Sequence, residues 1–335
     1  MRKLFIAAAL VFFAAAFAQR ANSAEPPLVR IAHGAYNEKI AALWIGVEQG
    51  FFRKHGLNVE VINIRNGPQT IAALAAGEIQ IAYTIPGTVL SAVAGGMDLA
   101  FFAGVVNRAD GDLMTAPGIK SAEELKGKRV GVQSIGGGVW SMTMLALEHL
   151  GLEPTRDKIT LLILGDQSVL TPALSTGGID AAYLSDTYSV PLKAKGFNVL
   201  VDMAKAPIPY QGLALAAPRS TLKQRPQIVD ALLRGVVESI AFIQQPARKE
   251  TVIKSLIKNL RLKNPTDAES GYDALQWLYS LDIRPNLKGV ENMHRLLALT
   301  NPKMKSVKSE DVVDDAPVER LQKSAFYREL AARKK

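Results

Sequence analysis

The sequence predicts an α/β protein made of two similar βαβαβ lobes that are joined by two hinge strands. Three observations support this fold class. The segment 73–83 recurs as 173–183, and both copies read Ala-Leu-x-x-Gly-x-Ile-x-x-Ala-Tyr. The same alternation of strand-like and helix-like segments precedes each copy. Two apolar segments bounded by Pro or Gly connect the halves, as expected for paired hinge strands.

The first half of the chain has the pattern of a parallel sheet covered by helices. Apolar residues at helical spacing occupy 40–52, and Gly56 follows this segment. The next segment, 57–64, alternates like a strand, and the turn Asn66-Gly67-Pro68 separates it from the next helix. The expected order of strand, helix, strand, helix and strand is 28–32, 40–52, 57–64, 69–76 and 79–83.

The same order recurs in the second half, so the similarity covers a whole βαβαβ unit. Solenoid repeats have periods of about 20 to 50 residues, which are shorter than the spacing here. The repeat therefore predicts two lobes facing each other across a cleft. The expected strands and helices of this half alternate at 129–132, 139–150, 158–164, 168–175 and 179–183.

Two crossings divide the chain into a discontinuous lobe one and a continuous lobe two. Residues 113–116 lead into lobe two, and 211–216 lead back. We therefore assign 25–115 and 215–335 to lobe one and 116–214 to lobe two. The predicted hinge residues are Thr115, Ala116, Leu213 and Ala214. Helical apolar spacing at 226–243, 247–260, 267–281 and 290–299 predicts four further helices that pack mainly on lobe one.

The first residues have the layout of a secretory signal peptide, which we assign to 1–24. Arg2 and Lys3 form a basic start, an uncharged apolar run follows, and small residues provide two candidate cleavage sites. The apolar run is shorter than the roughly 20 residues that span a bilayer. A lipid-anchored export protein needs a cysteine at its new N-terminus, and this sequence has none. We therefore expect a soluble periplasmic protein.

Composition excludes several classes of function. The 335 residues include 40 Lys and Arg against 31 Asp and Glu, a formal charge of +9, and no cysteine. Much of the basic excess lies near the C-terminus, without the interleaved aromatic residues typical of a nucleic-acid-binding stripe. Without cysteine, disulfides, metal–thiolate sites and thiol nucleophiles are excluded. We expect a monomer that binds no nucleic acid.

The predicted site follows from the strand ends. Ligands of open α/β sheets bind beyond the carboxyl ends of the strands, so two facing lobes direct six loops at one cleft. The crossing back to lobe one adds Gln211. The candidate ligand-binding residues in the six loops are His33, Tyr36, Asn37, Asn66, Gly67, Thr84, Ile85 and Pro86 in lobe one, and Ser134, Gly136, Gly137, Gly138, Asp166, Ser185, Asp186 and Tyr188 in lobe two.

The glycine-rich loop 134–138 lies between an expected strand and an expected helix. Its glycines let the backbone approach a ligand, and the helix N-terminus favours an anionic group. A merely flexible loop is the alternative. The loop has neither the Gly-x-Gly-x-x-Gly of dinucleotide sites nor the Gly-Lys-Ser/Thr of P-loops.

For three of the candidate ligand-binding residues, two interpretations stay open. Asp186 can accept a hydrogen bond from a ligand amine or ring N–H, or cap the next helix. Tyr36 and Tyr188 can stack on a planar ligand, or be ordinary surface or core tyrosines. The repeated Gly, Ile and Tyr are interpreted as scaffold, so specificity should depend on the residues after each copy.

No catalytic or metal site is predicted. His33 is the one histidine near an expected strand end, and His55, His149 and His294 are not spaced as metal ligands. Ser134 lacks the surroundings of a nucleophile elbow. We therefore expect no catalytic residue, no metal and no cofactor.

Five segments resemble the extracytoplasmic substrate-binding proteins of ABC importers, in the branch for nitrate, sulfonates, taurine and thiamine pyrimidine precursors. The first of them begins Ala-Leu-Trp-Ile-Gly-Val-Glu-Gln-Gly-Phe-Phe at Ala42. The resemblance spans about nine tenths of the mature chain and is strong because the segments keep the family's order. The matching segments are 41–60, 66–69, 73–83, 119–132 and 225–233.

The resemblance implies a type II periplasmic binding protein, in which a small molecule bridges two lobes in the cleft. It also implies capture without chemistry and an ABC permease and ATPase complex as partner. A ligand closes such a protein only through its higher affinity for the closed state.

The predicted loops depart from the nitrate and sulfonate binders because they offer only Lys39 and Arg65 as cations. This favours an organic molecule with one anionic or polar head over a small inorganic anion. Sulfonate-like, aromatic carboxylate and pyrimidine-like ligands stay open. Two alternatives to transport are an enzyme of pyrimidine or menaquinone-precursor metabolism and a partner of a membrane sensor kinase.

Overall fold

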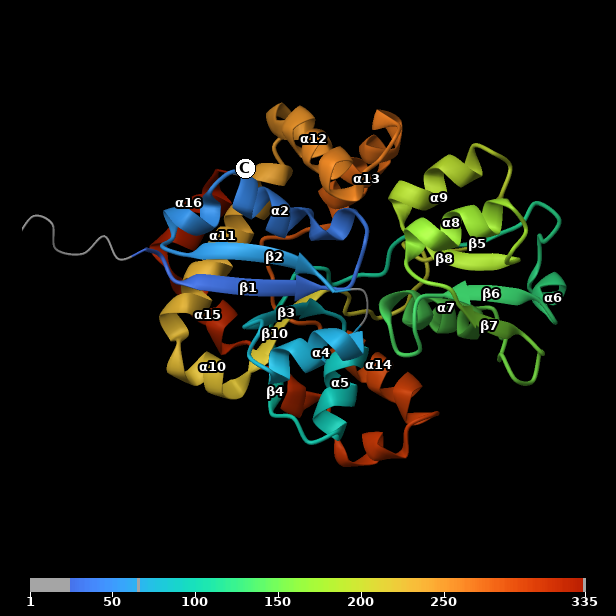
Figure 1. Ribbon diagram of the computed structural model, residues 1–335, viewed down its shortest axis with the longest axis horizontal. Helices are drawn as coiled ribbons and strands as arrows, with labels where there is room; N and C mark the ends of the chain where they lie inside the picture. The colour runs from blue at the N-terminus through green and yellow to red at the C-terminus, as the bar shows by residue number, and fades with distance from the viewer. Residues whose placement is uncertain (1–24, 65–66, 334–335) are drawn as a thin grey trace, which may run out of the picture.

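The computed structural model describes residues 25–64 and 67–333. They form two five-stranded sheets, each covered by helices, and Figure 1 shows the resulting two lobes side by side. This confirms the predicted α/β class with two lobes. The predicted signal segment 1–24 and the candidate Asn66 lie outside the described residues.

The sheet of lobe one has the strand order β2-β1-β3-β10-β4. The first three strands run parallel, whereas β10 runs antiparallel to both β3 and β4. The strands are β1 (Leu28–His33), β2 (Asn58–Asn63), β3 (Ile81–Thr84), β4 (Leu99–Gly104) and β10 (Ala214–Pro218). The intervening helices are η1 (Glu38–Ile40), α2 (Ala41–Glu48), α3 (Phe51–Lys54), α4 (Gly67–Ala75) and α5 (Pro86–Ala94).

The sheet of lobe two repeats this topology with the order β7-β6-β8-β5-β9. Here β5 is the antiparallel strand, between β8 and β9. The strands are β5 (Asp112–Thr115), β6 (Arg129–Val132), β7 (Thr160–Ile163), β8 (Ala181–Leu184) and β9 (Asn198–Asp202). The helices are α6 (Ala122–Leu125), α7 (Gly138–His149), α8 (Gln167–Ser175) and α9 (Asp186–Lys193).

The repeated sequence has the same local geometry in both lobes. Gly77 and Gly177 have φ angles of 74° and 76°, a conformation that glycine adopts without steric penalty at a helix end. Three residues later, Gln80 accepts a hydrogen bond from the Arg30 N–H at 2.9 Å. Asp180 accepts one from the Arg129 N–H at 2.8 Å. Each repeat therefore ties the segment just before its own strand, β3 or β8, to the neighbouring parallel strand, β1 or β6.

The crossings lie elsewhere than predicted. Thr115 pairs with Ala181 and Asn198 inside the second sheet, so Thr115 and the following Ala116 are not hinge residues. The apolar run 113–116 belongs to a buried antiparallel strand, and Pro117-Gly118 follows the end of that strand. The predicted boundary at 116 is therefore too late, because the second sheet already includes Asp112.

The connections run through 105–111 and 203–213, and they touch each other. The N–H groups of Val105 and Val106 both donate to the Leu213 carbonyl at 3.0 Å, and the Gly212 N–H donates to the Val106 carbonyl at 2.8 Å. Leu213 thus lies at the crossing, as predicted. Ala214 is the first residue of β10 and pairs with Thr84 and Gly104 in the first sheet.

The C-terminal helices cover lobe one and also reach lobe two. Helix α11 packs on α2 and α3, whereas α13 lies against α9 and α14 against α7. An Arg295–Glu148 ion pair of 2.7 Å links the last two helices across the lobes. The helices are α10 (Arg219–Gln224), α11 (Pro226–Ile243), η2 (Pro246–Arg248), α12 (Lys249–Leu260), α13 (Pro265–Leu278), α14 (Leu287–Ala298), η3 (Pro302–Ser306), η4 (Glu310–Val312), α15 (Ala316–Lys323) and α16 (Ala325–Ala332).

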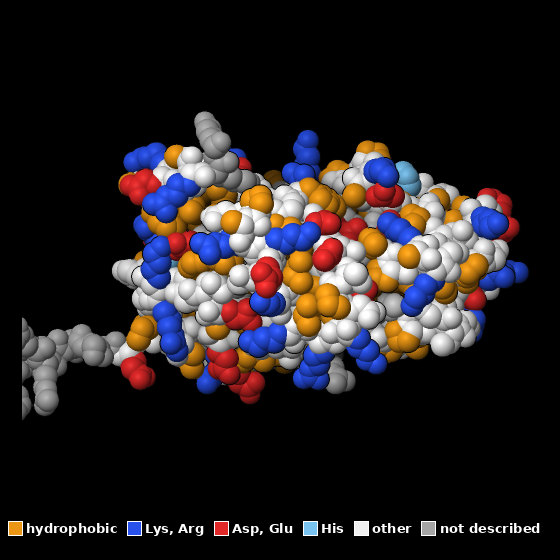
Figure 2. All heavy atoms as spheres, turned by 90° about the horizontal axis from the view of Figure 1, so that it is seen from above, with side chains coloured by type: hydrophobic (Ala, Val, Ile, Leu, Met, Phe, Trp, Pro, Cys, Tyr) orange, Lys and Arg blue, Asp and Glu red, His pale blue; other side chains and the backbone are white. Residues whose placement is uncertain are grey.

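Surface charge is dispersed on the face that Figure 2 shows. Lys and Arg side chains alternate there with Asp and Glu rather than forming one basic stripe. Among the described residues, no helix combines the length and apolar character that crossing a membrane requires.

Candidate ligand-binding cleft

A pocket lies between the lobes, at the carboxyl ends of their parallel strands. It encloses about 740 Å³ of space free of protein atoms, open solvent at its mouth included. Both lobes and both crossings contribute to its wall. The lining residues are Gly34, Ala35, Tyr36, Asn37, Lys39, Gly67, Tyr83, Thr84, Ile85, Thr88, Val106, Asp110, Gln133, Ser134, Gly137, Gly138, Val139, Met142, Asp166, Gln167, Tyr183, Tyr210, Gly212 and Leu213.

Two helices from opposite lobes begin at this wall. Helix α5 has Ile85 as its N-cap and α7 has Gly137, and neither terminus carries a side-chain cap. Uncapped N-termini leave backbone N–H groups and a partial positive charge for a ligand. The hydroxyls of Thr84, Thr88 and Ser134 also line the pocket. The wall therefore provides donors for an anionic or polar group from both lobes.

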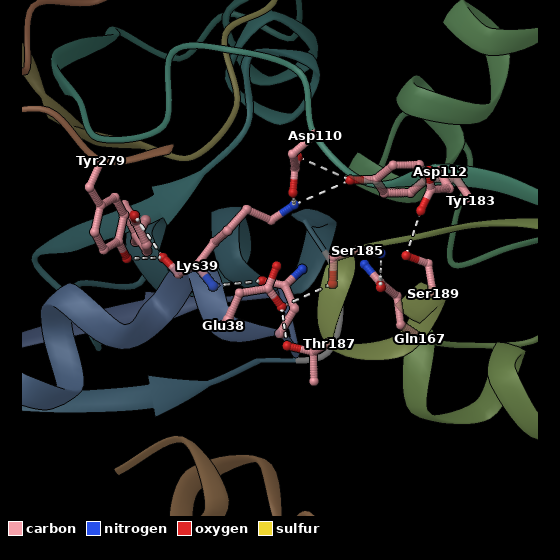
Figure 3. A network of polar contacts seen from close by, with 12 residues as sticks. Glu38, Lys39, Asp110, Asp112, Gln167, Tyr183, Ser185, Thr187, Ser189 and Tyr279 are labelled. Carbon is pink, nitrogen blue, oxygen red and sulfur yellow. Dashed lines mark hydrogen bonds and ion pairs between the residues drawn. The ribbon is translucent and has the colours of Figure 1, made fainter. Parts of the chain in front are cut away.

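A buried ion pair between Lys39 and Asp110 lines the pocket; Figure 3 shows its contacts. The Lys39 ammonium donates to both oxygens of Asp110, at 2.9 and 2.7 Å, and to the Tyr183 hydroxyl at 3.2 Å. The Tyr183 hydroxyl donates in turn to Asp110 at 3.1 Å. Burial acts to lower the pKa of Lys39, but the carboxylates of Asp110 and Glu38 outweigh it and hold that pKa above its ordinary value. The Lys39 ammonium is thus charged, and the Asp110 carboxylate already balances its charge.

Two tyrosine hydroxyls hold the backbone of Lys39. Tyr83 and Tyr279 both donate to the Lys39 carbonyl, at 3.1 and 2.8 Å. The three-residue helix η1 begins just before it, where the Asn37 side chain accepts a hydrogen bond from the Lys39 N–H at 3.2 Å. These contacts leave the ammonium little freedom to turn toward a ligand.

Direct hydrogen bonds join the two lobes around the pocket. Glu38 accepts from the hydroxyls of Ser185 at 3.0 Å and Thr187 at 2.7 Å (Figure 3). The Tyr188 hydroxyl donates to the Tyr36 carbonyl at 3.1 Å. Contact is also tight at Gly87 of lobe one, where an added Cβ would lie 2.7 Å from the carbonyl oxygen of Gly136 in lobe two. The lobes are therefore closed on each other.

Most of the predicted loop residues reach the pocket wall. Asp166 has a second role, because its carboxylate caps α8 by accepting from the Ser168 N–H at 2.9 Å. The predicted residues on the wall are Tyr36, Asn37, Gly67, Thr84, Ile85, Ser134, Gly137, Gly138 and Asp166.

His33 is structural and does not line the pocket. It is 3% exposed, its Nδ1 bonds the Ala35 carbonyl at 2.8 Å, and its ring meets Trp44 edge to face. Burial lowers the pKa of His33 to about 4, against the smaller raising effect of that hydrogen bond, so the ring is neutral at pH 7. The end of β1 turns this side chain into the core of lobe one.

Asp186 neither lines the pocket nor caps a helix. The N-cap of α9 is Ser185, and Asp186 is the first residue within the helix. Burial raises the pKa of Asp186 to about 7, with further contributions from the carboxylates of Glu38 and Asp110. The predicted cap is wrong because α9 begins one residue earlier than the capping interpretation requires.

The remaining predicted residues also lie away from the pocket wall. Ser185 and Tyr188 make the bonds between lobes described above. Gln211 is fully buried; its side-chain amide donates to the Val106 carbonyl at 3.1 Å and accepts from the Asn286 N–H at 2.6 Å. Pro86 is the first residue of α5, and Gly136 lines a neighbouring groove.

Several residues of the pocket wall were not predicted from the sequence. Tyr83 and Tyr183, interpreted as scaffold, both line the pocket and both contact Lys39. Their position at the end of the repeated strand was a usable signal, because ligands bind beyond strand ends. Asp110 and Tyr210 come from the crossings, where no local pattern marked them.

Solved structures of other proteins share this fold. A protein from Bordetella bronchiseptica RB50 superposes with a TM-score of 0.75, at 22% identity, over 88% of this chain and 96% of that one. The aliphatic sulphonate-binding protein SsuA from Escherichia coli gives 0.69, at 20% identity, over 86% and 92%. The nitrate-binding protein NrtA from Synechocystis PCC 6803 gives 0.72, at 14% identity, over 92% and 90%. The chain has the fold of periplasmic binding proteins.

The family follows from the sequence. The chain belongs to the family described as NMT1/THI5-like, whose model matches residues 37–249, well over half of its length. A Brucella abortus (strain 2308) protein described as a candidate binding protein is 30% identical over 140 residues. The match spans 41% of this chain and 41% of that relative, about two fifths of each.

Proposed function

We propose that this protein is a periplasmic receptor that captures a small organic molecule by closure of its lobes and delivers it to an ABC importer. The observation that carries the proposal is the pocket between the lobes, with one uncapped helix N-terminus from each lobe. A ligand held by both lobes binds the closed form better than the open one, and so stabilises closure.

The pocket favours an organic ligand with one anionic or polar head. Lys39 is the cation on the described wall, and Asp110 already neutralises it. Donors for the head are then the helix N-termini and the hydroxyls, while tyrosine rings and apolar side chains face the rest of the ligand. Sulfonate-like, aromatic carboxylate and pyrimidine-like molecules fit this description. The names of SsuA and NrtA support an anionic group.

Delivery without chemistry is the second part of the proposal. On the described pocket wall there is no histidine, and Ser134 is the only serine. Its hydroxyl lies beside Gly137, where an added Cβ would approach it to 2.6 Å. Nucleophilic catalysis needs a base within hydrogen-bond reach of the nucleophile. A receptor needs only contacts that strengthen on closure.

A ligand screen tests the proposal. Mature protein is melted with alkanesulfonates, nitrate, aromatic carboxylates and pyrimidines, and any hit is followed by calorimetry and small-angle scattering. One class should raise the melting temperature, since ligand at about 100 times Kd stabilises by ~2.7 kcal/mol. The same ligand should make the protein more compact and be recovered unchanged. Recovery of a modified compound would indicate an enzyme, and no shift with any class would contradict the receptor.

A further inference from the structure

Two buried carboxylate oxygens behind the pocket wall have no hydrogen-bond partner among the residues that the structure describes. They are Oε1 of Glu38 and Oδ2 of Asp186. Glu38 is fully buried and belongs to η1 of lobe one, whereas Asp186 begins α9 in lobe two. Buried polar atoms are almost always paired, so two orphaned oxygens from opposite lobes require a physical explanation.

The neighbouring carboxylate oxygens already accept hydrogen bonds. Glu38 uses its other oxygen for Ser185 and Thr187, and both oxygens of Asp110 accept from Lys39. One oxygen of each of Glu38, Asp110 and Asp186 lies within 4.8 Å of the other two. Three carboxylates thus lie close together, and the Lys39 ammonium binds one of them, Asp110. Lys39 balances the charge of Asp110, so Glu38 and Asp186 would leave two buried negative charges without a counter-ion. Such burial is costly, and a buried carboxylate takes up a proton instead.

A metal ion fits this cluster poorly. Both oxygens of Asp110 accept hydrogen bonds from Lys39, so only Glu38 and Asp186 could bind a divalent cation. Calcium takes six to eight oxygen ligands and magnesium takes six. A ligand amine also fits poorly, since neither Glu38 nor Asp186 lines the pocket. A single proton meets the need of both orphaned oxygens.

We propose that Glu38 and Asp186 share one proton taken up from water, and that the resulting carboxyl–carboxylate hydrogen bond is a pH-dependent latch between the lobes. The latch adds to the fixed bonds of Glu38 with Ser185 and Thr187. It forms only when the lobes are closed, because its two carboxyl groups belong to different lobes. In the open form each carboxylate meets water and gives up the proton.

The charged surroundings set the direction of the pH response. Burial raises the pKa of Asp186 to about 7, helped by Glu38, Asp110 and Asp112 and opposed by Lys39. Burial also raises the pKa of Glu38, while Lys39 and the Thr187 hydroxyl oppose it. Tyr183, Tyr188 and Tyr279 also face the pair, and burial raises each of their pKa values, so they keep their protons.

The sign of the effect follows from these shifts. An aspartate in water has a pKa of about 3.9, so between about pH 4 and pH 7 the closed form binds a proton that the open form lacks. Closure should therefore be favoured in this range. The advantage falls as the pH rises through 7, where Asp186 of the closed form also loses its proton.

Ligand-free protein provides the test, and the absence of cysteine makes site-specific labelling simple. The exposed side chains of Glu123 in lobe two and Lys254 in lobe one are replaced by cysteine and spin-labelled. Pulsed electron resonance then measures the distance between lobes at about pH 5 and about pH 8.5. We expect the ratio of closed to open protein to fall roughly tenfold or more at the higher pH.

Matched variants identify the responsible group. Asp186→Asn keeps a donor toward Glu38 without a titrating group, so closure should lose its pH dependence. Tyr188→Phe removes another bond between the lobes from the same helix and should keep the pH dependence. If Asp186→Asn does not fold, Asp186→Ala replaces it, and its ratio of closed to open protein at about pH 5 should fall toward the value at about pH 8.5.

Three results would overturn the latch. They are wild-type distances that do not change with pH, an unchanged pH response in the Asp186 variant, and closure by millimolar calcium at about pH 8.5 that depends on Asp186, which would indicate a cation site. The inference rests on the lobe movement proposed above. The ligand screen uses neither these variants nor a pH series, so either test can fail alone.

Discussion

Replacing Asp110 by alanine should lower the free energy of unfolding by about 3–5 kcal/mol, because it leaves the Lys39 ammonium buried without its counter-ion. The side chains of Lys39 and Asp110 are 9% and 1% exposed. Glu38 stays nearby and should keep the loss toward the lower end of this range. Urea denaturation followed by circular dichroism measures the change.

An exposed ion pair gives the matched control. Arg320 and Asp230 are 3.2 Å apart, with side chains 47% and 40% exposed. Asp230→Ala should cost no more than about 1 kcal/mol, because water screens this pair. Replacing both partners of the buried pair, as Lys39→Met with Asp110→Leu, should recover much of the loss. Equal costs for Asp110→Ala and Asp230→Ala would contradict a tightly held ion pair at the pocket.

Gly138→Leu should weaken ligand binding about tenfold to a hundredfold, the equivalent of 1–3 kcal/mol of overpacking. Gly138 begins α7 on the pocket wall, and an added Cβ would stand 3.7 Å from Ile85 of the opposite lobe. A leucine there extends into space that the ligand needs. Calorimetry with the best ligand of the screen measures the effect.

Gly138 tests the pocket more cleanly than the neighbouring Gly137. At Gly137 an added Cβ would lie 2.6 Å from the Ser134 hydroxyl, so a bulky residue there would disturb the loop itself. Gly118→Leu is the control, because nothing lies within 4 Å of a Cβ at that exposed turn. Gly118→Leu should bind normally. Normal binding by Gly138→Leu, with an intact melting transition, would remove the start of α7 from the site.

The repeated βαβαβ units could be predicted because their signals are local. Helices ended at glycines with positive φ, such as Gly77 and Gly177, and short apolar strands followed them. The strands outside these repeated units were harder to predict. β4 and β9 were missed, and β5 was taken for a crossing, because a buried apolar run of four residues looks alike in a sheet and in a hinge.

Part of the site could be predicted because local signals also locate the strand ends. Strand ends located the loops that carry Tyr36, Thr84 and Ser134, since the carboxyl ends of parallel strands meet at one edge. The same rule misplaced His33, because it locates a residue at a strand end without stating which way its side chain points.

By itself, the sequence determined the two lobes, the order of strands and helices within each repeated βαβαβ unit, and the loops that face the cleft. Each of these depends on spacing and turn chemistry within a few residues. Only the tertiary structure decided which charges meet. Lys39 contacts Asp110, 71 residues away, and Tyr183, 144 residues away. Carboxylate oxygens of Glu38 and Asp186, from opposite lobes, lie within 4.8 Å of each other. Such contacts arise when distant segments pack, and no local pattern records them.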